Sequence, residues 1–378
     1  MSNRNDLPAH DAAATRPAPD PHPDKLISLE AGRFFAALGV VLFHYTALVE
    51  DFTHVTVLAN IFRPGHVGVP YFFVLSGFIM YHVHRRDMGR ANAVRYFAVR
   101  RAIRLFPMFW GISLVMLIGF LMVPSLAVNR PPSMQGIVFD LLLLPHKDAI
   151  LAISWTLRHE VVFYLFFSLM LLFGNRALWL VGLWIFASLT GAAFHLDRLG
   201  LGNWSIVGSN LNLGFGLGIL CAMGVARPSD RHPLWWIVGG GGALALLGAL
   251  EWHLGRFAPH GEHVLGQADD IGYLIAAAAL IYGLAKMEKR LSIPGAGLWK
   301  MLGGASYLLY LLHQPMGSVL VRIMPVSGLS PLALFALVTL AATLASVMAH
   351  LLVERPITAW LSRNVRVAKP VAASAAAA

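Results

Sequence analysis

The sequence has little charge and almost no cysteine. Only 13% of its 378 residues are Asp, Glu, Lys or Arg, about half the share found in a typical soluble domain, whereas 57% are hydrophobic. So few charged side chains cannot cover the surface of a water-soluble protein of this length. The single cysteine, Cys221, excludes a disulfide framework, CxxC redox chemistry and a cysteine-rich metal site. The composition therefore predicts an all-α polytopic membrane protein.

The chain also lacks the short motifs of several common enzyme classes. It contains no HExxH motif, no Walker loop, no GxSxG elbow and no dinucleotide-binding glycine fingerprint. A net charge of +10 would suggest nucleic acid as a partner of a soluble protein. Here the basic residues lie between apolar segments, where they orient a membrane protein. We therefore predict neither a metal site nor a nucleic-acid partner.

About ten apolar stretches are predicted to cross a bilayer whose hydrocarbon core is about 30 Å thick. They comprise residues 33–50, 67–82, 105–127, 152–173, 177–194, 205–225, 235–251, 269–285, 301–321 and 331–353. Most of the 29 Lys and Arg residues fall on one side of this arrangement, which predicts that both termini are cytoplasmic.

The two ends of the chain differ from this core. Residues 1–25 contain no apolar run, so we expect a disordered cytoplasmic tail rather than a signal peptide. Residues 367–378 are rich in alanine and are expected to form a loose tail. A single transmembrane domain is predicted between them, at residues 26–366.

Two polar side chains lie in the first predicted span. Arg33 lies at its cytoplasmic edge, and His44 follows eleven residues later, about 16 Å deeper and on the same helical face. Ionisable groups inside a membrane need a polar environment, so the pair indicates a cavity entered from the cytoplasm. From the spacing alone, a structural histidine bonded to a neighbouring carbonyl explains His44 equally well.

The second span and the connection after it contribute further candidates. The stretch GVPYFFVLSGF is typical of close helix packing, with Ser76 as a small polar notch. The following connection is the most basic region and ends in RRAIRLFP, where Arg101 and Arg104 lie three residues apart. Because the fork of donors on arginine suits phosphate groups, this pair is predicted to bind phosphate as well as to fix the topology.

Polar residues also enter the fourth span, SWTLRHEVVFY. Glu160 lies there with Tyr164 one turn later, and a carboxylate at this depth needs a partner. Arg158 would hold it structurally, whereas His44 would pair with it in a catalytic site. His159 faces a different side of the helix and is interpreted as structural.

In the ninth span, Ser306, Tyr310 and His313 form a polar stripe on one helical face before Pro315. The stripe fits either a substrate path or hydrogen bonds between helices. The candidate substrate-path residues of the whole chain are Ser76, Tyr164, Ser306, Tyr310 and His313.

In this order, the motifs resemble those of membrane-bound acyltransferase family 3. The resemblance rests on the spacing of Arg33 and His44, on GVPYFFVLSGF, RRAIRLFP, SWTLRHEVVFY and SYLLYLLHQP, and on the ERP that begins at Glu354. It extends over nearly the whole ten-helix core. Within the family, the chain looks most similar to acyltransferases of exopolysaccharide production, which have the membrane domain alone.

The resemblance implies transfer of an acyl group, usually acetyl from acetyl-CoA, to a hydroxyl of a bacterial surface glycan or its lipid-linked precursor. It implies that His44 is catalytic, that Arg33 is its partner in the first span and binds the donor, and that Arg101 and Arg104 bind the donor. Glu160, within the fourth-span motif, is a second catalytic candidate. The implied location is the bacterial inner membrane, with polysaccharide assembly proteins as further candidate partners.

The chemistry of these residues agrees with the resemblance and leaves alternatives open. His44 can take the proton of a hydroxyl that attacks the thioester, or carry the acyl group itself. Arg33 or a neighbouring donor would stabilise the oxyanion, and Glu160 would orient the imidazole. A proton-coupled transporter or glycan flippase also explains buried His, Arg and Glu residues. A third interpretation is a purely structural component of a polysaccharide export complex, which would need neither acyl transfer nor transport.

Overall fold

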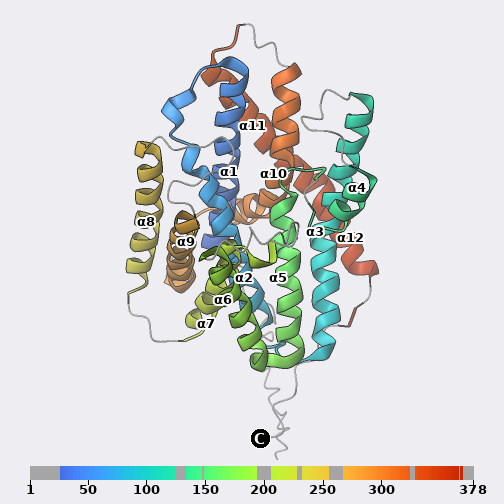
Figure 1. Cartoon of the computed structure of the whole chain (residues 1–378), viewed down its shortest axis with the longest axis vertical. Coiled ribbons are helices and arrows are strands. Elements are labelled where there is room, and N and C mark those ends of the chain that lie inside the picture. Colours follow the sequence, from blue (N-terminus) through green and yellow to red (C-terminus); the bar gives the residue numbers. More distant parts are fainter. Residues whose placement is uncertain are drawn as a thin grey trace, which may run out of the picture.

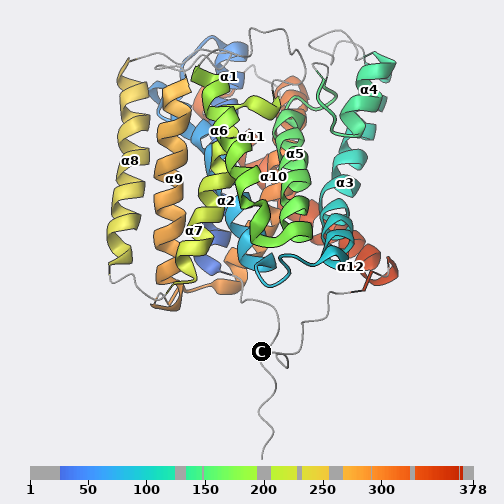
Figure 2. The same cartoon turned by 60° about the horizontal axis from the view of Figure 1, so that its bottom comes forward.

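The computed structural model describes residues 26–123, 133–146, 149–193, 206–227, 232–254, 267–290, 292–323, 328–365 and 367–368. Within these ranges the chain forms helices joined by turns, without a strand. Figures 1 and 2 show the helices side by side in one bundle. The predicted all-α class is therefore confirmed. The tails predicted at residues 1–25 and 367–378 lie outside the described residues, apart from 367–368.

Each of the predicted apolar stretches overlaps a helix in the described residues. These helices are α1 (Ile27–Thr53), α2 (Gly68–His84), α3 (Ala91–Met122), α5 (Ser154–Phe173), α6 (Leu178–Ala193), α7 (Leu213–Val225), α8 (Pro233–Leu254), α9 (Gln267–Met287), α10 (Ala296–Ile323) and α11 (Pro331–Ala349). In the described residues, 7 helical segments are long and apolar enough to cross a bilayer. The chain is a multi-pass membrane protein, whereas ten crossings and cytoplasmic termini stay predictions.

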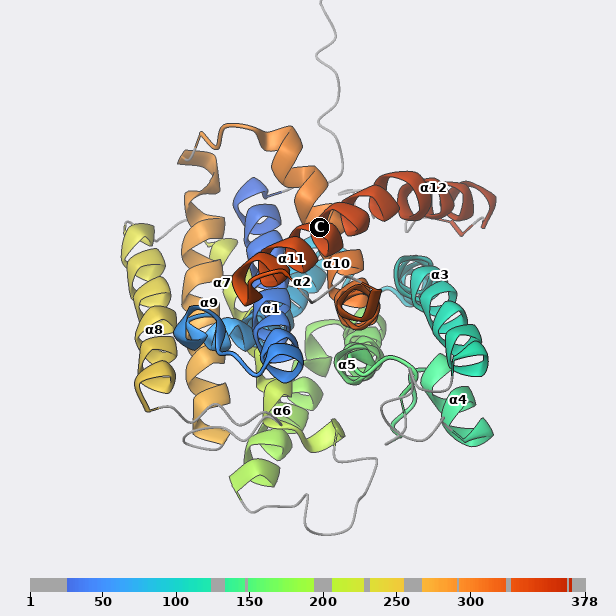
Figure 3. The same cartoon turned by 90° about the horizontal axis from the view of Figure 1, so that it is seen from above.

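Two further helices were not expected from the apolar pattern. Helix α4 (Met134–Leu141) is capped by Ser133, whose hydroxyl accepts a hydrogen bond from the backbone N–H of Gly136. Helix α12 (Arg355–Asn364) follows a π-helical turn at His350–Glu354. Pro356 fits the first turn of α12 because a backbone N–H is not needed there. Figures 1 and 3 show that α12 leaves the bundle at an angle to the other helices.

The two ends of the bundle are distinguished by the helices that lie there. The beginnings of α1, α3 and α10 surround a common space with the end of α2 and with α12. We call this end the lower face, since α12 and the beginning of α3 lie at the bottom of Figure 2. The opposite end, which carries α4 and the end of α1, is called the upper end (Figure 2).

Small residues allow the central helices to approach closely. Helix α1 packs mainly on α10, and α2 packs mainly on α7. A Cβ atom added to Gly77 would lie 2.1 Å from the carbonyl oxygen of Phe215, and one added to Gly218 would lie 2.0 Å from that of Val74. Glycine is therefore required where α2 and α7 touch, which supports the packing role expected for the second span.

A buried ion pair between α4 and α5 fastens the upper end. Arg158 on α5 donates from Nη2 to Oδ1 of Asp140 on α4 at 2.5 Å, and both side chains are buried. Asp140 also accepts from the hydroxyl of Ser154 and the backbone N–H of Ile150. The predicted pairing of Arg158 with Glu160 is therefore wrong, because residues two apart on a helix face different sides. His159 donates from Nδ1 to Oδ1 of Asn212, as its structural interpretation requires.

Candidate functional site

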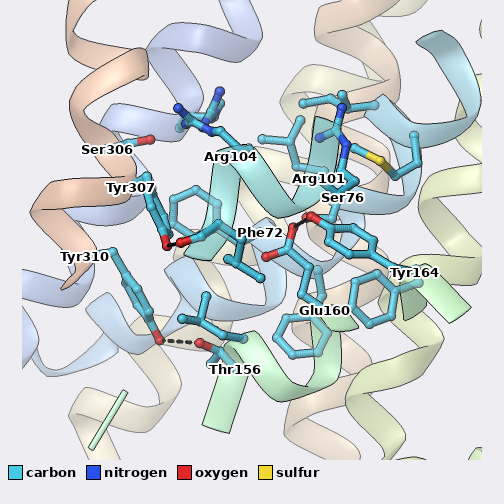
Figure 4. Close-up of a pocket in the computed structure, with 18 of the residues that line it drawn as sticks. Phe72, Ser76, Arg101, Arg104, Thr156, Glu160, Tyr164, Ser306, Tyr307 and Tyr310 are labelled. Atoms are coloured by element: carbon cyan, nitrogen blue, oxygen red, sulfur yellow. Dashed lines mark hydrogen bonds between the residues drawn. The ribbon is translucent and has the colours of Figure 1, made fainter. Parts of the chain in front are cut away.

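A cavity of about 180 Å³ lies between α1, α2, α3, α5, α7 and α10, and we call it the inner cavity. Its polar lining residues are Arg33, Ser76, Arg101, Arg104, Thr156, Glu160, Tyr164, Ser306, Tyr307 and Tyr310. All of them except Arg33 are labelled in Figure 4. Every predicted site residue except His44 and His313 is among them. Aromatic and aliphatic side chains complete the wall, including Phe72, Phe73, Leu157 and Phe215.

A larger space of about 1110 Å³ opens at the lower face, and we call it the vestibule. Its basic lining residues are Arg33, Arg100, Arg101, Arg104, Lys300 and Arg355. Three of these, Arg33, Arg101 and Arg104, line the inner cavity as well. They therefore form the boundary between the two spaces, which is where an anionic group entering from the lower face would meet them.

Arg33 and Arg101, two of the arginines at this boundary, have N–H donors that are not all taken up by hydrogen bonds within the protein. Nη1 of Arg33 lies 3.5 Å from a carboxylate oxygen of Glu30, one turn earlier on α1. The guanidinium of Arg101 lies 5.9 Å from the ring centroid of Phe97. Nε of Arg101 is buried without a hydrogen-bond partner in the described part of the chain. A buried donor without a partner is unfavourable, so this nitrogen is suited to an anionic ligand.

Glu160 projects into the inner cavity with a tyrosine as its partner. The hydroxyl of Tyr164, one turn later on α5, donates to Oε1 of Glu160 at 2.5 Å (Figure 4). No hydrogen bond or ion pair joins Glu160 to His44 or Arg158 within the described residues. The predicted His44–Glu160 pair is therefore absent from this structure: Glu160 bonds to Tyr164 on its own helix, whereas helix packing places His44 against His313 on α10.

The stripe on α10 lines the cavity and also joins helices. Tyr310 and Thr156 share a hydrogen bond of 3.0 Å between their hydroxyls, across α10 and α5 (Figure 4). Tyr307 donates to the carbonyl oxygen of Leu105 at 2.7 Å, and Ser306 donates within its own helix. Sequence reasoning missed Thr156 and Tyr307. The signal for Thr156 was its position four residues before Glu160, on the same face of α5.

His44 and His313 lie together outside the inner cavity. Their ring centroids are 5.1 Å apart, and the ring of His313 lies 5.7 Å from that of Tyr310. His313 donates from Nδ1 to the carbonyl oxygen of Tyr310, so Nε2 carries the lone pair. This Nε2 is buried and has no hydrogen-bond partner among the described residues. His313 and Tyr310 thus connect His44 to the cavity wall.

The two spaces together suit a ligand with phosphate groups at one end and a narrow arm at the other. The phosphates would lie among the arginines, and the arm would extend between the aromatic walls toward Glu160 and Tyr310. Across the described ranges, no three His, Cys, Asp or Glu side chains gather in a group that could hold a metal ion.

The helical bundle, with its basic vestibule and polar inner cavity, defines a multi-pass membrane protein with an internal site. The family model described as the acyltransferase domain matches residues 26–351, so the chain belongs to membrane-bound acyltransferase family 3, as its motifs predicted. The chain is also 29% identical over 313 residues to the exopolysaccharide production protein ExoZ of Rhizobium meliloti (strain 1021). That match covers 78% of this chain and 90% of the relative. No solved structure matches the chain.

Proposed function

We propose that the protein is an O-acyltransferase of the bacterial inner membrane, which moves acetyl from acetyl-CoA to a hydroxyl of a surface glycan or its lipid-linked precursor. The observation that carries the proposal is the position of Arg33, Arg101 and Arg104 between the vestibule and the inner cavity. Family membership supports acyl transfer, and the name of the ExoZ relative favours an exopolysaccharide as the acceptor. The lower face is then the cytoplasmic face, where acyl-CoA is available.

The residues present fit coenzyme A, which carries a pyrophosphate and a ribose phosphate at one end. Arg101 and Arg104 would bind phosphate, and the unpartnered Nε of Arg101 would gain an acceptor. Lys300 and Arg355 extend the basic lining of the vestibule toward the ribose phosphate. The slender pantetheine arm would then pass the arginines and place the thioester in the inner cavity.

Bound acetyl-CoA supplies an activated acyl group. The acceptor oxygen attacks the thioester carbonyl carbon, the carbon–sulfur bond breaks, and the proton of the hydroxyl ends on the sulfur of coenzyme A. Arg33 or Arg101 would donate to the carbonyl oxygen as negative charge develops. Glu160, oriented by Tyr164, would accept a hydrogen bond from the incoming hydroxyl.

His44 keeps the catalytic role that the family resemblance implies, as the base that takes the hydroxyl proton or as the residue that carries the acyl group. The ring of His44 contacts that of His313, which in turn contacts Tyr310 in the wall of the inner cavity. To react with His44, the acceptor or the acyl arm would therefore have to pass Tyr310. The acceptor would therefore approach from the side of His44, opposite to the arginines that hold the donor.

The test compares purified wild type in detergent with His44→Ala and with the double variant Arg101→Ala/Arg104→Ala. Binding and slow hydrolysis of acetyl-CoA are measured, by calorimetry and thiol release. We expect the arginine variant to lose binding and the histidine variant to lose turnover alone. The matched control is Arg86→Ala/Arg95→Ala, which removes the same charge from exposed positions outside both spaces and should bind normally.

Two outcomes would contradict the proposal. Failure of folded wild type to bind acetyl-CoA would favour a transporter or flippase, in which the arginines only fix topology. Full transferase activity in His44→Ala would remove that histidine from the mechanism. The acceptor is tested separately, from the acetyl content of exopolysaccharide made by cells that carry wild type or His44→Ala.

A further inference from the structure

A buried carboxylate that the proposed mechanism does not use lies next to the vestibule, bonded to the lining residue Arg104. Glu354 is the last residue of the π-helical turn between α11 and α12, and its side chain is only 2% exposed. A buried carboxylate next to a site for a phosphate-bearing ligand is unfavourable unless cationic groups hold it. Single π-helical turns also occur frequently at functional sites.

Both oxygens of Glu354 are engaged. Oε1 accepts from Nη1 of Arg104 at 2.5 Å, and Oε2 accepts from Nδ1 of His350 at 2.7 Å. His350 lies one turn earlier and packs on α10, where a Cβ atom added to Gly304 would lie 2.6 Å from its Nε2. The carboxylate is therefore fixed in position, since rotation would break a hydrogen bond to a buried group.

The guanidinium of Arg104 is held on its edge and on its face. Glu354 binds the edge, while the ring of Tyr307 lies 5.4 Å from the guanidinium carbon. Tyr307 is itself fixed by its hydrogen bond to the carbonyl oxygen of Leu105. A guanidinium has five N–H donors, and the Arg104 side chain is 33% exposed toward the two spaces. Donors beyond the one that Glu354 engages are thus available to a ligand in a fixed direction.

We infer that Glu354 is a positioning residue for donor binding, which, together with His350, orients Arg104 toward a phosphate group of the acyl donor. The inference rests on the proposed function and adds the π-helical turn to the donor site. The turn continues into α12, whose Arg355, Thr358 and Ser362 line the same vestibule. Helix α12 is therefore part of the wall that would bind the donor.

The direction in which donor affinity changes when Glu354 is replaced distinguishes a positioning role from simple charge neutralisation. If Glu354 only neutralised Arg104, it would compete with the phosphate, and its removal would tighten donor binding. If it orients Arg104, its removal weakens binding, because a long flexible side chain then has to be ordered when the donor binds.

The experiment uses full-length purified protein and measures the Kd of acetyl-CoA and the kcat and KM of its hydrolysis. We expect Glu354→Ala to raise Kd and KM about tenfold while kcat stays within about twofold. Glu354→Gln retains an oxygen for Arg104, so Kd should rise only about threefold. As a control, Glu50→Ala breaks the 2.6 Å pair of Glu50 with Arg63 at the upper end and should leave Kd unchanged.

A second arm combines substitutions at the two partners. In the background of Arg104→Ala, replacing Glu354 with alanine should have no further effect on Kd, because the residue acts through Arg104. Tighter binding in either single variant at Glu354, or additive losses in the double variant, would overturn the inference. If Glu354→Ala does not fold, the inference is tested with Glu354→Gln instead. An unchanged or lower Kd of acetyl-CoA in that variant contradicts the inference. Wild type that does not bind acetyl-CoA would instead refute the proposed function.

Discussion

The arginines at the two ends of the bundle differ in what holds them. At the upper end, Arg63 pairs with Glu50 at 2.6 Å and Arg158 pairs with Asp140 at 2.5 Å. At the lower face, Arg101 has no carboxylate within ion-pair distance in the described part of the chain, and its Nε has no partner. In the sequence all of them are simply arginines near the ends of apolar stretches. The structure separates the arginines that pair with buried or partly buried carboxylates from those that line the two open spaces.

The difference follows from the cost of burying charge. Asp140 is fully buried and accepts hydrogen bonds from three donors, one of them Arg158, so its negative charge is satisfied. The lower arginines face two open spaces, where water or an anion can meet them. Arg104 is intermediate, because Glu354 holds one edge of a guanidinium that still lines both spaces.

The largest expected effect is the loss of stability when the ion pair between Arg158 and Asp140 at the upper end is broken. Arg158→Ala should lower the free energy of unfolding by about 3–5 kcal/mol, because it leaves Asp140 buried without its counter-ion. Thermal unfolding in detergent measures this loss. The double variant Arg158→Met/Asp140→Asn should recover part of the stability. An unchanged melting temperature in the single variant would show that the upper arginines are no more structural than the lower ones.

At the lower face the same kind of substitution should spare the fold and impair binding. Arg101→Ala should raise the Kd of acetyl-CoA at least tenfold, about 1.4 kcal/mol, since a charge-assisted contact with phosphate is lost. Its melting temperature should stay near that of wild type, because no ion pair is broken. Arg101→Lys should recover only part of the affinity, since lysine lacks the planar fork of donors. A large loss of stability in Arg101→Ala would erase the difference between the two ends.

Much of the candidate site could be predicted from the sequence. Helical spacing grouped Glu160 with Tyr164 and Ser306 with Tyr310, and these four residues line the inner cavity. Apolar stretches located the helices, because a bilayer demands long runs of uncharged residues. These features depend on local spacing, which a single sequence displays directly.

The partners of the polar groups could not be predicted in the same way. Arg158 binds Asp140 on α4, a short helix without a long apolar run, and Arg104 binds Glu354, which is 250 residues away. Both pairings depend on which helices pack together. The expected contact of His44 with Glu160 failed for the same reason, since His44 meets α10 at His313 instead.

A smaller effect is expected at the connection between the two histidines and the cavity. His313→Phe keeps a ring next to His44 and removes both nitrogens. If proton or acyl transfer involves His44, turnover should fall about tenfold, because the ring next to His44 then lacks the buried Nε2 lone pair that would accept a hydrogen bond from a protonated His44. The Kd of acetyl-CoA should stay within about twofold of the wild-type value, since His313 lines neither the inner cavity nor the vestibule. Unchanged turnover would assign His313 to packing alone.

The smallest expected effect is that of removing the Thr156 hydroxyl. It distinguishes a substrate path from hydrogen bonding between helices as the role of the polar stripe on α10. Thr156→Val keeps the shape of the side chain and removes the hydroxyl that meets Tyr310 at 3.0 Å. Hydrogen bonds between membrane helices contribute about 0.6 kcal/mol on average, so unfolding should shift by roughly that amount. Thr190→Val is the control, because its hydroxyl bonds only within α6. If Tyr310 only joins helices, stability alone changes. If it also lines the path of the acyl group, turnover falls about threefold as well, because the freed phenol no longer holds its place in the cavity.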